Sequence, residues 1–285
     1  MTAAAQEATT FLWLEITGRC QLECVHCYAE SSPAGDHGAM AAEDWERVLA
    51  QAAAHGVEQV QLIGGEPTLH PDFARLVGRA LELGLEVEVY TNLYRVPAAL
   101  WEVFSRPGVR IATSWYSADP HAHEAITGRV GSHARTRANI AEAVRRGIPI
   151  RAGIIELGDE QGTEHARTEL IALGLAENAI GFDRLRAFGR GAAALPDETD
   201  TCGECGHGCA AVLPDGSVVP CVFTRMAVAG SVRSGPLDAI LAGSAFGARV
   251  EHLDRVRTVR DRGCGPTCMP CTPCPPCRPS CSPMG

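Results

Sequence analysis

Short apolar runs alternate with amphipathic helical segments along most of this chain, and this alternation constrains its fold more than any other feature. The six runs are residues 11–16, 57–63, 85–90, 109–115, 148–155 and 179–185. Between them, apolar residues recur three and four positions apart, and glycines close the helical patterns at Gly56, Gly84 and Gly147. The last of these helices is expected to use Ser132 as its N-cap. Strict alternation predicts an α/β fold in which a parallel sheet forms a partial (β/α)6 TIM-like barrel.

The pattern changes after about residue 190. Residues 210–220 predict a β-hairpin that turns at Pro214-Asp215-Gly216, and a helix is expected at 236–242. The end of the chain, 264–285, consists almost wholly of Cys, Pro, Gly, Ser and Thr, which cannot build an apolar core without a metal. We therefore expect a barrel domain at 1–190 and a small cysteine-rich domain at 191–285.

Composition excludes several classes of function. The net charge is −9 and positive charge is not concentrated over most of the chain, so nucleic acid is not an expected partner. The N-terminus has no signal-peptide pattern, and no apolar run approaches the roughly 18 residues of a membrane span. A cytoplasmic protein that does not bind a membrane is expected.

The 13 cysteines are the main functional signal. In a reducing compartment, cysteines in such numbers are metal ligands more often than disulfides. Cys20-x3-Cys24-x2-Cys27 places three thiols in the loop after the first strand. Three ligands leave one iron of a four-iron cluster open to a chelating molecule, whereas a structural cluster or zinc site would use a fourth cysteine. A zinc loop that borrows a distant ligand is the alternative.

A second motif follows the next strand. Paired glycines, Gly64 and Gly65, would let a ligand approach the backbone, and Glu66 before Pro67 could accept from a ligand amine. An ordinary βα turn is the alternative. Because active sites of such barrels lie at the C-terminal ends of the strands, both motifs are expected on the same face.

Together these motifs resemble the radical S-adenosylmethionine (SAM) superfamily. Its pattern is C-x3-C-x-Φ-C with Φ aromatic; His26 takes that place here and Tyr28 follows. The resemblance implies a [4Fe–4S] cluster on Cys20, Cys24 and Cys27 that binds SAM, with GGEP at the methionyl amine. It further implies SAM contacts, each equally compatible with a plain loop residue, at Thr91, Asn92, Ser114, Arg129 and Gly189-Arg190-Gly191.

The later cysteines resemble the SPASM extension of this superfamily. The spacing is Cys205-x10-Gly216-x4-Cys221, then Cys268-x2-Cys271-x5-Cys277-x3-Cys281. The resemblance implies a first auxiliary [4Fe–4S] cluster on Cys205, Cys221 and Cys281, with Cys202 or its rival Cys209 as fourth ligand. A second would use Cys268, Cys271 and Cys277. Its last expected cysteine has no counterpart before Gly285, and Cys264 or Cys274 would substitute. A single auxiliary cluster, as in twitch relatives, and a zinc knot are the alternatives.

The resemblance implies a radical SAM enzyme that cleaves SAM to a 5′-deoxyadenosyl radical and abstracts a substrate hydrogen. Modification of a ribosomally made peptide is the favoured hypothesis, with an electron donor such as flavodoxin or ferredoxin. About ten residues precede the first strand, so we expect no fused leader-binding domain; recognition would then need either a separate leader-binding partner or direct contact with the barrel. Residues 249–262 are rich in arginine and would either bind an acidic leader or form a solvated helix face. The alternatives are a dehydrogenase or epimerase of an aminocyclitol or sugar, and a non-catalytic iron–sulfur or zinc protein.

Overall fold

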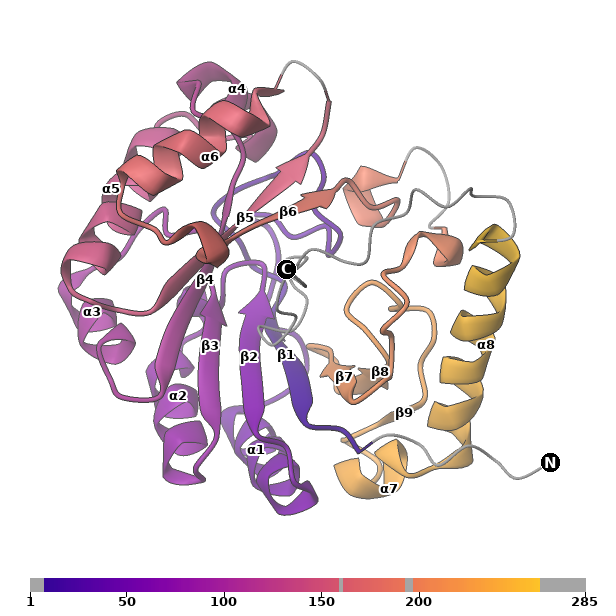
Figure 1. The fold of residues 1–285 in the computed structure, drawn as a ribbon. Coiled ribbons are helices and arrows are strands. Elements are labelled where there is room, and N and C mark those ends of the chain that lie inside the picture. The colour runs from indigo at the N-terminus through magenta and orange to yellow at the C-terminus, as the bar shows by residue number, and fades with distance from the viewer. Residues whose placement is uncertain (1–7, 159–160, 193–196, 262–285) are drawn as a thin grey trace.

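The computed structural model describes residues 8–158, 161–192 and 197–261. Its sheet has nine strands in the order β6-β5-β4-β3-β2-β1-β7-β8-β9 (Figure 1). The strands are β1 Phe11–Thr17, β2 Gln59–Gly64, β3 Glu86–Tyr90, β4 Val109–Trp115, β5 Ile150–Glu156, β6 Ile180–Arg184, β7 Cys209–Val212, β8 Ser217–Val219 and β9 Gly230–Ser231. Strands β1 to β6 pair in parallel in chain order, which confirms the predicted barrel-type α/β fold.

Helices cover the outer face of the parallel strands (Figure 1). The helices are α1 Ala42–His55, α2 Phe73–Glu82, α3 Ala98–Phe104, α4 Pro120–Thr127, α5 Ser132–Arg145, α6 Thr163–Ala172, α7 Leu237–Leu241 and α8 Ser244–Asp261. Short 3-10 turns lie at Pro67–Leu69, Glu177–Ala179, Gly189–Gly191 and Glu198–Asp200. Within the described residues, none of the helices has both the length and the apolarity to span a membrane.

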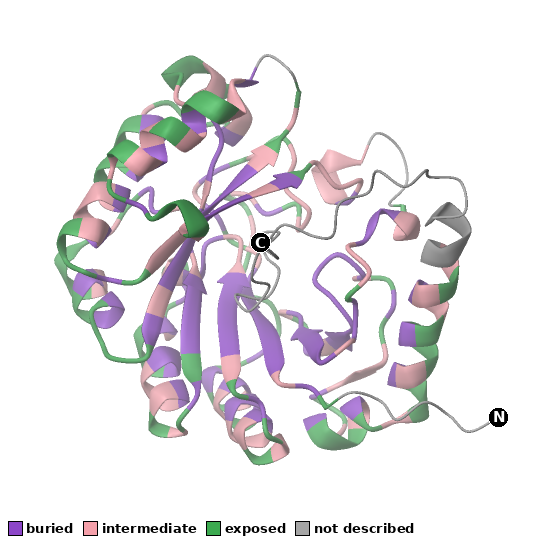
Figure 2. Ribbon diagram, viewed as in Figure 1, coloured by how far each residue is buried: buried purple, intermediate pink, exposed green. Residues whose placement is uncertain are grey.

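The helices form where apolar residues recur on one face. In α1, Trp45, Val48, Leu49 and Ala52 are buried against the sheet, as the three- and four-residue spacing predicts. Figure 2 shows the same division over the molecule, with purple strands inside and green patches on the outer faces of the helices. Burial of this continuous stripe fixes which way each helix faces, and therefore fixes the loops that follow the strands.

The predicted cap of α5 is wrong by one residue. The N-cap is Gly131, whose φ of 78° is left-handed, and Ser132 is the first helical residue. The Ser132 hydroxyl is instead buried in a 2.7 Å hydrogen bond with Thr127 Oγ1, which joins the start of α5 to the end of α4. A glycine is favoured at a left-handed position because it has no Cβ to clash.

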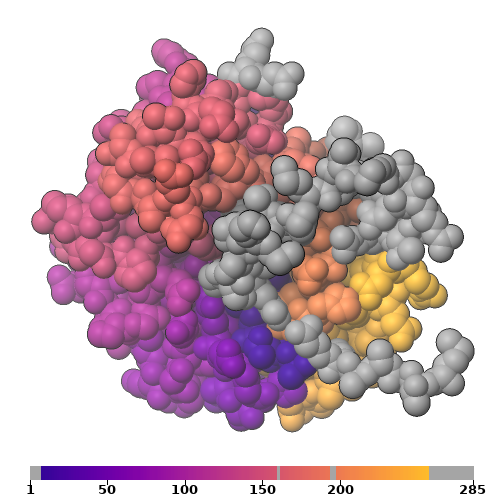
Figure 3. Space-filling view, in the orientation of Figure 1, coloured from indigo at the N-terminus to yellow at the C-terminus, as the bar shows by residue number. Residues whose placement is uncertain are grey.

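The C-terminal hairpin continues the barrel sheet. Strand β7 pairs in parallel with β1, with Phe11 opposite Cys209 and Leu14 opposite Val212. Strand β8 then pairs with β7 in antiparallel, which confirms the predicted hairpin. In the space-filling view the orange and yellow C-terminal residues pack against the indigo and purple strand region (Figure 3). The division into domains at residue 190 stays a prediction, and the described part of the second segment shares a sheet with the first.

A second apolar core lies on the face of β1 away from α1. It contains Phe11 and Trp13 of β1, Phe188 after β6, and Val219 and Phe223 of the C-terminal segment. Cys205, Cys209 and Cys221 belong to the same cluster. This core joins the interior of the barrel to the later cysteines.

Candidate functional site

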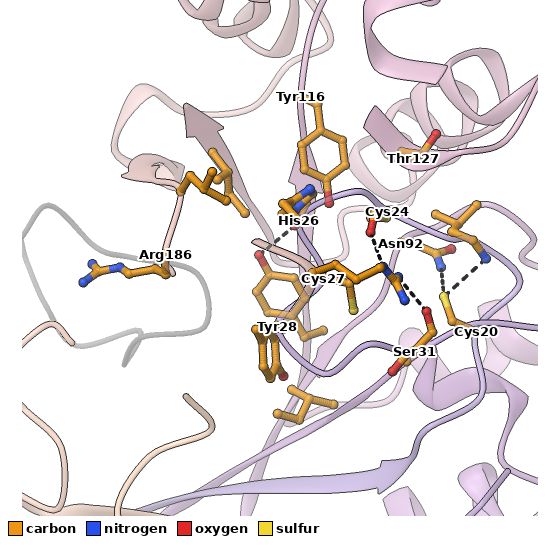
Figure 4. A pocket seen from close by; sticks show the side chains of 18 of the residues that line it. Cys20, Cys24, His26, Cys27, Tyr28, Ser31, Asn92, Tyr116, Thr127 and Arg186 are labelled. Carbon is orange, nitrogen blue, oxygen red and sulfur yellow. Dashed lines mark hydrogen bonds between the residues drawn. The ribbon is translucent and has the colours of Figure 1, made fainter. Parts of the chain in front are cut away.

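The three early cysteines open onto one cavity at the C-terminal ends of the strands (Figure 4). The space within it, including the part open to solvent, is about 1090 Å³. The predicted site residues that line it are Cys20, Cys24, Cys27, Tyr28, Gly64, Gly65, Thr91, Asn92, Ser114 and Arg190. They come from the C-terminal ends of β2 and β4 and from the loops after β1, β2, β3 and β6, so the structure brings together on one face the motifs that lie far apart in the sequence.

The turn after β2 lies directly against the cysteine loop. A Cβ on Gly65 would meet the Arg19 carbonyl oxygen and would lie 2.9 Å from the Cys20 Cβ. Only glycine therefore fits at this position, and the contact leaves the backbone of the Gly-Gly pair beside Cys20. The paired glycines were expected to let a ligand approach the backbone. They also let the turn after β2 approach the cysteine loop.

Arg190 holds the cysteine loop in place. Its Nε donates to the Cys24 carbonyl and one terminal nitrogen donates to the Ser31 carbonyl, both at 2.8 Å. Its backbone N–H donates to the Cys27 carbonyl at 3.0 Å. A side chain on Gly189 would collide with the carbonyls of Cys27 and Tyr28. The segment Gly189-Arg190-Gly191, which was predicted to contact SAM, therefore clamps the loop that carries the cysteines.

The Cys20 and Cys24 thiols are disfavoured as bare thiolates. Burial raises the pKa of Cys20 far above its usual value, and the Glu66 carboxylate raises it further. Burial and the neighbouring Cys27 raise the pKa of Cys24 to about 12. Thiolates at these positions need positive charge beside them, and a coordinating metal supplies it. Three thiols at one cavity wall fit the open-iron cluster inferred from their spacing.

Unpaired polar atoms surround the same cavity. His26 Nδ1, Ser31 Oγ and His123 Nδ1 are buried and lack hydrogen-bond partners among the described residues, and all three residues line the cavity. Burial, together with Arg190, lowers the pKa of His26 to about 4, so its ring is neutral at neutral pH. Buried polar atoms without partners are costly, which indicates that a polar ligand completes them.

Asn92 connects the cysteine loop to the loop after β3. Its Nδ2 donates to Cys20 Sγ at 3.6 Å, and its Oδ1 accepts from Gln21 Nε2 at 2.9 Å. Hydrogen bonds to a thiolate stabilise its charged form. Asn92 therefore acts on the Cys20 sulfur itself, beside any contact with SAM.

Glu66 lies behind the cavity wall and is 1% exposed. Its Oε1 accepts from the Thr68 backbone and hydroxyl and from the Thr91 hydroxyl at 2.8 Å. Among the described residues, Oε2 accepts only from the Asn92 backbone, at 2.8 Å. Burial raises the pKa of Glu66, and these hydrogen bonds oppose that rise. Glu66 thus joins the loops after β2 and β3, and Oε2 keeps capacity for a further donor. Its contact with an amine stays a prediction.

Arg129 lies at the surface rather than in the cavity lining. Its Nε donates to Tyr94 Oη at 3.3 Å, and its Cζ lies 5.5 Å from the centre of the Tyr94 ring. The predicted contact between Arg129 and SAM stays a prediction. Pro67 is buried at the start of the turn after β2 and also lies outside the lining.

Sequence reasoning missed Tyr116, which lies beside the cysteines. Its ring meets that of His26 edge-on at 4.9 Å, and its hydroxyl interacts with Cys24 and Ser114. The sequence did offer a way to find it. Residues two apart in a strand lie on the same face, and Tyr116 follows the predicted site residue Ser114 by two positions. Tyr90, which bonds Ser114 at 3.0 Å, shares the same wall.

A buried ion pair forms another part of the wall. Arg186 donates to Asp183 at 2.8 Å, and both side chains are less than a tenth exposed. Both line the cavity, and Arg186 lies apart from the cysteines in Figure 4. Nothing in the sequence distinguished this pair from ordinary surface charges, because its burial depends on the fold.

The structure groups three of the later cysteines. The thiol of Cys205 is hydrogen-bonded to those of Cys202 and Cys221, and these bonds together with burial raise the pKa of Cys205 well above its usual value. Cys209 Sγ donates instead to the Glu204 carbonyl at 3.1 Å. This grouping favours Cys202 over Cys209. Cys264, Cys268, Cys271, Cys274, Cys277 and Cys281 lie outside the described residues.

In the part of the chain that the structure describes, no three His, Cys, Asp or Glu side chains are close enough to hold a single ion. A four-iron cluster binds its ligands through several iron atoms and does not require that closeness.

Aromatic rings lie between the early and the later cysteines. The centre of the Tyr28 ring, which follows Cys27, lies 5.1 Å from the centre of the Phe223 ring, and Phe223 follows Cys221 by two residues.

Two family models match the chain. Residues 14–167 match the Radical SAM superfamily, and residues 202–278 match SPASM, an iron–sulfur cluster-binding domain. The chain is 32% identical over 195 residues to the PqqA peptide cyclase of Ruegeria pomeroyi, covering 66% of the chain and 51% of that protein. It is 26% identical over 180 residues to the subtilosin biosynthesis protein AlbA of Bacillus subtilis, covering 62% of the chain and 40% of that protein.

The chain thus spans about half the length of the curated relatives it matches. Its fold is similar to that of Streptococcus suis SuiB, solved with the precursor peptide SuiA, with a TM-score of 0.70. The sequence identity is 16%, and the match covers 88% of this chain and 67% of that one.

Proposed function

This chain belongs to the radical SAM superfamily, and on that premise we propose that it modifies a peptide by removing a hydrogen atom from it. It is a radical SAM enzyme with a SPASM domain, and its cofactors are SAM and iron–sulfur clusters. The identity with PqqA peptide cyclase carries the peptide proposal, and the likeness to AlbA supports it. Family membership favours an enzyme over a non-catalytic iron–sulfur or zinc protein.

Cys20, Cys24 and Cys27 would hold the cluster that binds SAM, with Gly64, Gly65, Asn92, Ser114 and Tyr28 around SAM. When bound, the cluster and SAM supply one electron and a 5′-deoxyadenosyl radical. Arg190 would keep the cysteine loop in its binding conformation through the Cys24 and Ser31 carbonyls. Asn92 would stabilise the Cys20 thiolate, and the cavity walls would exclude water from the reacting atoms.

Cys202, Cys205 and Cys221 would ligate the first auxiliary cluster, as the hydrogen bonding of their thiols favours. Cys281 would complete it, and Cys268, Cys271 and Cys277 would hold the second. One auxiliary cluster rather than two is the alternative, and an iron count distinguishes them. Phe223 lines the substrate cavity close to Cys221, so an auxiliary cluster here would lie beside the cavity.

The cavity offers both polar and apolar contacts to a substrate. The Asp183–Arg186 pair can meet amide groups, and Ile63, Ile155 and Phe223 offer apolar surface. A peptide residue presents both kinds of group. We propose two partners beside the peptide: a flavodoxin or ferredoxin that supplies the electron, and a separate protein that binds a leader segment. Arg249 and Arg255 of α8 are exposed, which fits a solvated helix face, and binding of an acidic leader there stays a proposal.

The test is co-production with a peptide encoded beside the gene, followed by mass spectrometry. A loss of hydrogen mass or a new crosslink in the peptide, absent with the Cys24→Ala variant, is the expected result. An unchanged peptide, with turnover of an aminocyclitol or sugar by the same preparation, would replace the peptide proposal with the small-molecule alternative.

A further inference from the structure

The cysteine loop reaches the molecular surface on the side of α4. Glu23 and Val25, on either side of Cys24, are exposed, and Val25 is 52% exposed. Their backbone N–H groups donate to the Thr127 and Ile126 carbonyls at 3.1 and 2.9 Å. The cysteine loop is therefore fixed against the end of α4 and the turn that leads into α5.

That turn and α5 place positive charge beside the loop. The Arg135 Cζ lies 4.8 Å from the centre of the Tyr94 ring, and Arg129 approaches the same ring. Among the described residues neither guanidinium has a carboxylate within ion-pair distance, whereas Arg137 pairs with Glu169 at 2.7 Å. Val130, between the two arginines in sequence, is 86% exposed.

We define the Tyr94 face as Val25, Tyr94, Arg129, Val130 and Arg135. Two acidic residues adjoin it: Glu23 is exposed, and Glu124 Oε1 accepts from the Gly131 backbone at 2.8 Å. The face therefore combines exposed apolar residues with arginines that have no carboxylate partner among the described residues, on a chain of net charge −9. Such a face suits transient association with an acidic partner.

Tyr94 connects this face to the site. Its ring packs with Cys20 and Leu22 in one buried cluster, and Cys24 packs against that cluster. Tyr94 therefore contacts both the arginines and the cysteine loop. The cavity must admit SAM and substrate, so an electron carrier needs another route of approach to the cysteines, and the Tyr94 face supplies a short one.

We propose that the Tyr94 face is the docking surface for an acidic one-electron carrier of the flavodoxin type. The reduced flavin loses one electron and the cluster held by Cys20, Cys24 and Cys27 gains it, once for each SAM cleaved. This inference rests on the proposed function, because it requires a reducible cluster at those cysteines. Arg129 and Val130 lie between α4 and α5, and Arg135 lies in α5; these helices lie on the opposite side of the molecule from α7 and α8 (Figure 1).

The test compares two double variants of the holoenzyme. The face variant combines Val130→Glu with Arg135→Glu. The control variant combines Arg106→Glu with Val228→Glu, which makes the same change in net charge elsewhere on the molecule. Arg106 is exposed at the opposite, N-terminal end of β4, and Val228 is 40% exposed near β9. Stopped-flow spectroscopy follows oxidation of flavodoxin hydroquinone by each protein, and a titration gives the dissociation constant for flavodoxin.

At low salt the face variant should accept electrons about tenfold more slowly than the wild type and bind flavodoxin correspondingly more weakly. The wild-type advantage should vanish at high salt, because salt screens the attraction. The control variant should match the wild type. With dithionite as reductant, all three proteins should form 5′-deoxyadenosine at the same rate. Arg135→Lys, which keeps the charge, should retain wild-type kinetics with flavodoxin.

Equal flavodoxin kinetics in the face variant and the wild type would overturn the docking proposal. It would also be overturned if Arg135→Lys were as slow as the face variant, since a loss that occurs with the charge retained cannot come from charge. Loss of dithionite-driven activity in a face variant that retains its iron would overturn it as well. Failure of the wild type with dithionite would instead count against the proposed function, so the two failures are distinguishable.

Discussion

Replacing Arg190 with leucine should loosen the cysteine loop without unfolding the barrel. The substitution removes two charge-assisted hydrogen bonds, to the carbonyls of Cys24 and Ser31. Such bonds contribute about 1.5–3 kcal/mol each, and water would replace part of that because Arg190 is only half-buried. A combined loss of about 3 kcal/mol would favour opening of the loop by about 100-fold, at about 1.4 kcal/mol for each tenfold change.

The assay is the rate at which the reconstituted protein loses iron to a chelator in excess. Arg190→Leu should lose iron from the SAM-binding cluster about 100-fold faster, and Arg190→Lys, which can keep one of the two bonds, about tenfold faster. Arg167→Leu is the matched control, since it removes only a surface ion pair with Glu177 and should not change the rate. Wild-type iron loss in Arg190→Leu would refute the clamp assigned to Arg190.

Two further predictions concern the later cysteines and pH. Cys205→Ser should remove one auxiliary cluster and so lower bound iron by about four atoms per chain. The wild type should hold about twelve iron atoms if both auxiliary clusters form and about eight if one does. An unchanged iron content in the variant would contradict the assignment of Cys205. Burial and the neighbouring His133 lower the pKa of His123 to about 4, so the unfolded chain takes up a proton that the folded one resists. Stability should therefore fall as pH drops from about 6.5 to 4, by up to about 3 kcal/mol from this residue, and urea denaturation should show a shallower fall for His123→Phe. Parallel pH profiles of the two proteins would contradict this origin.

The local elements were predictable because each depends on a short stretch of sequence. Burial on one face of α1 follows from the spacing of Trp45, Val48 and Leu49, and the glycine after the helix marks its end. The meeting of the cysteine loop with Gly64-Gly65 was also predictable, since the ends of parallel strands share one edge of a sheet. The N-cap of α5 was missed because Ser132 satisfies its hydroxyl through Thr127, a contact that local preference does not reveal.

Long-range pairings were not predictable. The hairpin pattern of residues 210–220 indicates that a strand precedes the turn, but it does not name β1 as the partner of that strand. Likewise, Arg190 follows β6 in the sequence as an ordinary loop residue, and only the fold brings it to carbonyls more than 150 positions away. The choice of Cys202 over Cys209 depends on which thiol faces Cys205, which spacing alone left open.

The central claim is that Cys20, Cys24 and Cys27 hold a cluster that cleaves SAM. The most direct measurement is formation of 5′-deoxyadenosine by the anaerobically reconstituted protein with dithionite and SAM. The wild type should form it, and Cys24→Ala should form none while still binding the iron of its auxiliary clusters. Product from Cys24→Ala at the wild-type rate, or no product from a fully iron-loaded wild type, would contradict the claim.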